Sequence, residues 1–122
     1  MITWPIGGLV AAIVLAGQSA GGLDMREMAA ASGEAYSHCL AYNAIKFDDG
    51  KSAPRDLVLI AKAKCSVDWS MYKFFVKQSE AARGKTDDTV LEAALGALDE
   101  IAIDNATNFV APVINSVRRE GQ

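Results

Sequence analysis

Residues 91–117 read LEAALGALDEIAIDNATNFVAPVINSV and carry the most regular apolar pattern in the chain. Apolar side chains recur there at steps of three and four, at Leu91, Leu95, Leu98, Ala102, Ala106, Phe109, Val113 and Val117. These steps match the period of an α-helix, so the stretch predicts a long helix with one face in a hydrophobic core. Pro112 lacks an amide proton and clashes with the preceding turn. We therefore expect a kink or an end near Val110 or Ala111, after which a short fourth helix could follow.

A first helix is predicted from about Met25 to Phe47. Asp24 precedes it as a suitable N-cap, and Glu27 three residues later completes a capping box. Gly33 lies in its middle, where glycine costs roughly 1 kcal/mol of helix stability relative to alanine. The side expected to face inward carries Met28, Ala35, Cys39 and Tyr42, with Tyr36, Leu40 and Phe47 beside it.

A second helix is predicted between a turn at 48–52 and a break at 84–88. Pro54 suits its first position, where an amide proton would have no partner, and the helix extends to about Arg83. It has two apolar stripes on nearly opposite sides, namely Val58, Ala61, Cys65, Trp69, Tyr72 and Val76, and Ile60, Ala63, Val67, Met71 and Phe74. Such a helix is either sandwiched between neighbours or exposes one side to a partner, and a bundle favours the sandwiched arrangement.

The chain has 122 residues, and its apolar content is rich in alanine with few β-branched runs. This composition favours an all-α fold, which we expect to be an antiparallel bundle of three or four helices formed by residues 23–122 as one domain. The second helix is mainly basic and the third mainly acidic, so adjacent helices carry complementary charge. Surface pairs of this kind contribute under about 1 kcal/mol each.

Cys39 and Cys65 are the only cysteines. The short turn at 48–52 makes the first two helices a hairpin in which both cysteines face inward at levels roughly one helical turn apart. We predict a disulfide between them, which closes a loop of about 25 residues and stabilises the fold by roughly 3 kcal/mol. Two buried free thiols in a cytosolic bundle are the alternative. The spacing is not that of a CxxC redox motif, and two cysteines with one histidine make a poor zinc site, so no metal site is predicted.

Residues 2–16 carry no charge, and small residues follow at 17–22. This pattern is typical of a secretory signal, although it lacks a lysine or arginine at its start. We therefore predict that residues 1–22 are a signal peptide and that the protein is periplasmic or secreted. Two alternatives remain: an uncleaved apolar anchor that tethers the protein to a membrane on the periplasmic side, and a buried helix of a cytosolic protein.

The sequence points to no catalytic residue and no cofactor. The net charge of −3 lacks the basic excess of nucleic-acid-binding proteins, and a membrane is an expected partner only if residues 1–22 are retained. No phosphate-binding loop or dinucleotide-binding motif is present. His38, the only histidine, is expected to be an exposed helical side chain. A small enzyme that uses His38, or a haem protein that pairs it with Met25 or Met28, is an alternative.

The leading hypothesis is a non-enzymatic protein that binds another protein or itself, in the manner of an immunity protein, adaptor or chaperone. The candidate binding face is the second apolar stripe of the second helix, with Ile60, Val67, Met71 and Phe74. A membrane-tethered structural protein is the second hypothesis.

Overall fold

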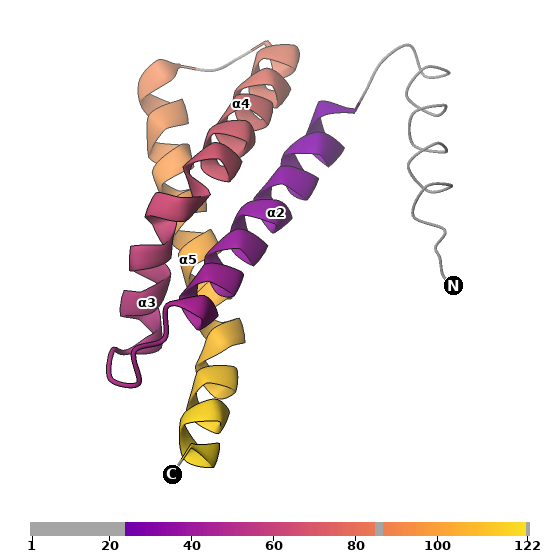
Figure 1. Cartoon of the computed structure of the whole chain (residues 1–122). Helices are drawn as coiled ribbons and strands as arrows, with labels where there is room; N and C mark the ends of the chain where they lie inside the picture. Colours follow the sequence, from indigo (N-terminus) through magenta and orange to yellow (C-terminus); the bar gives the residue numbers. More distant parts are fainter. Residues whose placement is uncertain (1–23, 85–86, 122) are drawn as a thin grey trace, which may run out of the picture.

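The computed structural model describes residues 24–84 and 87–121, so the signal or anchor predicted at 1–22 lies outside the described part. Every regular element in these residues is helical, which confirms the predicted all-α fold. The elements, coloured along the chain in Figure 1, are α2 (Met25–Lys46), α3 (Pro54–Ala61), the 3₁₀ turn η1 (Lys62–Cys65), α4 (Ser66–Arg83) and α5 (Asp88–Glu120). None of these helices is long and apolar enough to cross a lipid bilayer.

The other elements assemble on α2. It packs against α3, α4 and α5, and α3 also packs on α5. α4 stays close to α2 and η1, but within the described residues it makes few close backbone contacts with α5. Figure 1 shows α3 and α4 following one another along α2 in the opposite direction, with α5 crossing behind them. The core therefore lies around α3, which contacts both α2 and α5, whereas α4 packs mainly on α2.

Aspartate N-caps fix where the two longest helices begin. Asp24 accepts hydrogen bonds from the amides two and three residues ahead, as predicted, and Asp87 does the same at the start of α5. Each cap satisfies amides that have no partner within the helix.

The hydrophobic core lies where α2, α3, η1 and α5 meet. Its buried members are Tyr36, Leu40, Ala41, Ala44, Leu57, Val58, Ala61, Cys65, Ala102, Ile103, Ala106, Val110 and Ile114. No residue of α4 is fully buried, and its Trp69 and Tyr72 pack at the margin of this core. On α2 the buried side is that of Tyr36 and Leu40, whereas Tyr42, which was expected to face inward, is exposed.

The buried side of α5 departs from the predicted stripe in its C-terminal half. Phe109, Val113 and Val117 are exposed. The large side chains buried there instead are Ile103, Val110 and Ile114. Both sets recur at helical spacing, and α5 turns the second set inward because it packs on α3 as well as on α2.

Of the kink or end predicted near Pro112, the end does not occur: α5 is 33 residues long and runs from Asp88 through the proline to Glu120. The proline leaves the carbonyl of Asn108 without its usual amide partner. Both residues are exposed, so water can reach that carbonyl and the cost of the missing bond is reduced. No fourth helix separates from α5 within the described residues.

The predicted second helix is divided by η1 into α3 and α4. A 3₁₀ turn has three residues per turn instead of 3.6, so it rotates the face of α4 relative to that of α3. Cys65 ends η1 and is fully buried, where it bonds to α2. The interruption therefore lies at the point where the two helices of the hairpin are covalently joined.

The predicted charge complementarity between the second and third helices is confirmed by ion pairs to α5. Arg55 contacts Glu100 at 2.8 Å and Asp104 at 2.6 Å, and Lys62 contacts Asp99 at 2.9 Å.

Asp99 also links α5 to α2. It accepts a 2.7 Å hydrogen bond from the hydroxyl of Tyr36. Burial, together with this bond, raises the pKa of Tyr36 well above its ordinary value of 10.0. One carboxylate thus joins α2, η1 and α5.

Arg118 fastens the α2–α3 loop to the end of α5. Its guanidinium donates to Asp48 at 2.6 and 3.1 Å and to the carbonyl of Ser52 at 2.8 Å. The bond from Arg118, followed by one from the amide of Gly50, lowers the pKa of Asp48 below its ordinary value of 3.8. The ionised carboxylate therefore stabilises the folded state.

We expect Asp48→Asn to lower the free energy of unfolding near neutral pH, and this deficit to shrink as the pH falls. The folded-state pKa is depressed, so the contribution is complete above 3.8 and is lost as the pH drops through the folded value. Urea unfolding of both proteins between about pH 6 and pH 3 measures the difference. A deficit independent of pH would show that the charge is not what stabilises the loop.

Gly33 allows α4 to approach α2 closely. A methyl group at this position would lie 2.8 Å from Cζ of Tyr72, too close for an undisturbed ring. Tyr72 in turn packs against Tyr36 of α2, with ring centroids 6.4 Å apart, and edge-on against Trp69 of α4 at 5.8 Å. The glycine therefore creates the space for an aromatic contact between the two helices, in addition to weakening α2.

We predict that Gly33→Ala destabilises the protein by about 1 kcal/mol, since overpacking of roughly 1–3 kcal/mol exceeds the gain in helix propensity of about 1 kcal/mol. Gly96→Ala is the matched control, because Gly96 lies in α5 with no atom within 4 Å of the added methyl group. That variant should stabilise the protein by about 1 kcal/mol.

In a Tyr72→Ala background the steric conflict is removed, so Gly33→Ala should become stabilising as well. Chemical denaturation of the variants tests both expectations, and equal effects at the two glycines would contradict them.

Candidate functional site

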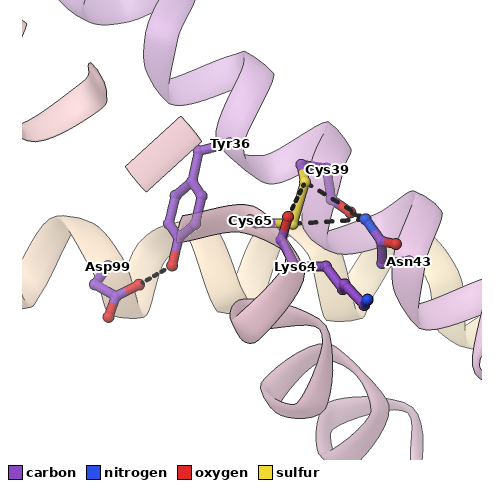
Figure 2. The surroundings of a disulfide bond; sticks show 6 residues. All are labelled: Tyr36, Cys39, Asn43, Lys64, Cys65 and Asp99. Carbon is purple, nitrogen blue, oxygen red and sulfur yellow. Dashed lines mark hydrogen bonds between the residues drawn. A yellow bond between two sulfur atoms is a disulfide. The ribbon is translucent and has the colours of Figure 1, made fainter. Parts of the chain in front are cut away.

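The predicted disulfide is present between Cys39 of α2 and Cys65 of η1. Their Cα atoms are 5.9 Å apart, within the range that such a bond requires. Figure 2 shows the bond beside Asn43, whose side-chain amide donates to the carbonyl of Cys39 at 2.9 Å and lies 3.5 and 3.7 Å from the two sulfurs. The bridge is thus enclosed by α2 on one side and η1 on the other, which suits a structural crosslink.

The carboxylate of Asp68 completes a group with these cysteines, because its oxygen and the two sulfurs lie within 4.8 Å of one another. The two cysteines could bind a thiophilic metal beside this carboxylate only as thiolates. With the sulfurs bonded to each other, their thiolate charges are gone, so this group is not a metal site in the oxidised protein.

The four residues of the predicted binding face are exposed. The exposed fractions are 55 % for Ile60, 73 % for Val67, 48 % for Met71 and 52 % for Phe74. Val67, Met71 and Phe74 recur at steps of four and three on α4, so their side chains share one side of that helix. The second stripe is therefore not sandwiched in the bundle, which corrects the arrangement favoured by the sequence.

The opposite stripe holds α3, η1 and α4 to the rest of the molecule. Val58, Ala61 and Cys65 are fully buried, and Trp69 and Tyr72 are partly buried against the core. The segment α3–η1–α4 thus packs one apolar stripe against the rest of the protein and leaves the other stripe at the surface. We call the exposed set of Ile60, Val67, Met71 and Phe74 the α3–α4 face.

A separate groove of about 330 Å³ lies between α2 and α5, with Tyr72 of α4 also in its lining. Residues that line it include Glu34, His38 and Ala41 of α2, Tyr72 of α4, and Ile101 and Phe109 of α5. The sequence did not indicate this groove, because its two walls are separated by about sixty positions along the chain and neither carries a motif. The only local signal is the exposed apolar residues on α5.

His38 is exposed, as predicted, and lies on the rim of this groove. The alternative in which it shares a haem with Met25 or Met28 does not fit α2. All three residues belong to this one helix, and His38 follows Met28 by ten residues, or about 15 Å along the axis. Two ligands so placed cannot approach one iron from opposite sides.

No family model, curated protein or solved structure matches this chain. Its surfaces and its crosslink are therefore the basis for a functional proposal.

Reduction of the disulfide should lower the free energy of unfolding by about 3 kcal/mol, because the unfolded chain regains the entropy that the crosslink removes. Urea denaturation with and without a thiol reductant measures this change. The double variant Cys39→Ala and Cys65→Ala should match the reduced wild type and be insensitive to reductant. Equal stability of oxidised and reduced protein would show that the bridge does not stabilise the hairpin.

Proposed function

We propose that this chain is an exported, non-enzymatic protein that binds another protein through the α3–α4 face. The observation that carries the proposal is the exposure of Val67, Met71 and Phe74 on one side of α4. A fully buried side chain of this kind contributes about 1.5–3 kcal/mol relative to an exposed one, and exposed apolar patches mark interaction sites. A partner that covers the face would gain this burial.

The charges beside the face specify the partner more closely. Lys64 precedes Val67 by three residues and Lys77 follows Phe74 by three, so both basic side chains lie one turn from an apolar residue of the face. Asp68 lies one turn before Met71, and Lys77 also approaches Glu92 of α5 at 3.9 Å, so the border is basic by two side chains to one. Both lysines are exposed. The partner that fits is a protein with an apolar patch bordered by acidic side chains, since opposite charges at a rim steer association and exclude other partners.

The disulfide supports this assignment in two ways. It fixes η1 to α2 immediately before α4 begins, so the start of α4 is held in place in the free protein. The exposed face therefore loses less conformational entropy when a partner binds. Stable disulfides are also typical of oxidising compartments outside the cytosol, which agrees with the signal predicted at 1–22. The intact mass of the protein from its host distinguishes cleavage of these residues from an uncleaved membrane anchor.

The test compares three versions of the oxidised protein as baits for crosslinking in the extracytoplasmic fraction of the host. These are the wild type, a face variant with Val67→Gln, Met71→Gln and Phe74→Gln, and a control with Val90→Gln, which alters an exposed apolar residue of α5. We expect a protein that the wild type and the control capture and the face variant loses. With that protein purified, the face variant should bind at least about 30-fold more weakly.

Salt and charge provide the second arm of the test. Lys64→Gln together with Lys77→Gln should slow association with the purified partner, and the difference from wild type should diminish as salt is added. Capture that is unchanged by the glutamines of the face variant would refute the proposal, provided that circular dichroism shows this variant to be folded. Capture of a second copy of this chain in place of an acidic-rimmed protein would refute the stated partner chemistry.

A further inference from the structure

We infer that the groove between α2 and α5 binds a small organic cation with an apolar body, such as an arylalkylammonium ion. This inference is independent of the proposed function, because the groove and the α3–α4 face share no residue. Its volume of about 330 Å³ lies at the lower end of the range for small-molecule sites.

The floor and walls of the groove suit an apolar body. The floor contains the small side chains Ala41, Ala102 and Ala106, all of which are buried, so a ligand can lie close to the helix backbones. Ile101 and Phe109 line the α5 side and remain 53 % and 63 % exposed. A ligand in the groove would cover apolar surface that is otherwise in contact with water.

The charge of the groove selects a cation. Glu34 is the one acidic residue among the described lining, and His38, one turn further along α2, is the one basic residue there, since neither lysine nor arginine lines the groove. Glu34 takes part in no ion pair within the described part of the chain, whereas Asp99, Glu100 and Asp104 of α5 are each paired with a basic side chain. The groove thus holds a negative charge that the fold itself does not use.

Aromatic rings complement this carboxylate. Tyr72 and Phe109 both line the groove, and an ammonium group near the face of either ring is attracted by its electron density. A smaller hollow of about 220 Å³ shares Ala30, Tyr72 and Leu98 with the groove and continues toward α4. An elongated ligand can therefore place its cationic end by Glu34 and extend its apolar end along the helices. An anionic ligand of the same shape would be repelled by Glu34.

The experiment uses three probes that differ mainly in charge: 2-phenylethylammonium, neutral 2-phenylethanol and anionic 3-phenylpropionate. Each is titrated into the isotopically labelled, oxidised protein, and backbone amide shifts locate and quantify binding. We expect the cation to bind about tenfold more tightly than the alcohol, from the combined carboxylate and aromatic interactions, and the anion to bind most weakly. Shifted amides should map to the groove residues of α2 and α5.

Two variants separate charge from shape. Glu34→Gln should reduce the affinity for the cation severalfold toward that of the alcohol, and leave the alcohol unaffected. Asp56→Asn is the matched control, because Asp56 is an exposed carboxylate of α3 outside the groove, and it should change nothing. Ala30→Leu should weaken all three probes by narrowing the groove. Equal affinities for the three probes, an unchanged cation affinity in Glu34→Gln, or shifts outside the groove would overturn the inference.

Discussion

The close approach of α2 to η1 at Cys39 and Cys65 is the constraint on which the rest of the structure depends. The 5.9 Å between their Cα atoms is attainable because small residues line the contact, among them Ala61. On one side of this point, α3 and α5 close around α2 to form the core. On the other side α4 packs mainly on α2 and makes few close backbone contacts with α5 in the described part of the chain, and the groove lies between α2 and α5.

Much of this architecture could be predicted from the sequence, because it is encoded by local chemistry. Asp24 and Pro54 mark helix starts, and the spacing of apolar residues marks the helices themselves. The pairing of Cys39 with Cys65 followed from the short hairpin turn. The α3–α4 face was identified as a candidate because its residues recur at helical spacing on the side of the chain away from the cysteine.

The remaining features depend on which elements lie opposite one another, and periodicity does not contain that information. In α5, Phe109 belongs to the more regular apolar stripe, yet Val110 is the residue that is buried where α5 packs on α2 and α3. The sequence of η1 contains no proline or glycine that would have predicted a break in the helix. From the sequence, Gly33 only weakens its helix; its role in making room for Tyr72 of α4 is evident only when the two helices are packed together. The groove was missed for the same reason, since its walls come from distant parts of the chain.

The position of the bridge also has a consequence for the order of folding. Both cysteines precede α5 in the chain and are separated by 26 positions, so the hairpin that joins them needs only local contacts. Because this hairpin contains both cysteines, it can form and oxidise before α5 docks on it. The last helix would then dock on a surface whose geometry is already covalently fixed, and a nascent chain with its two cysteines joined would have few wrong arrangements left to explore.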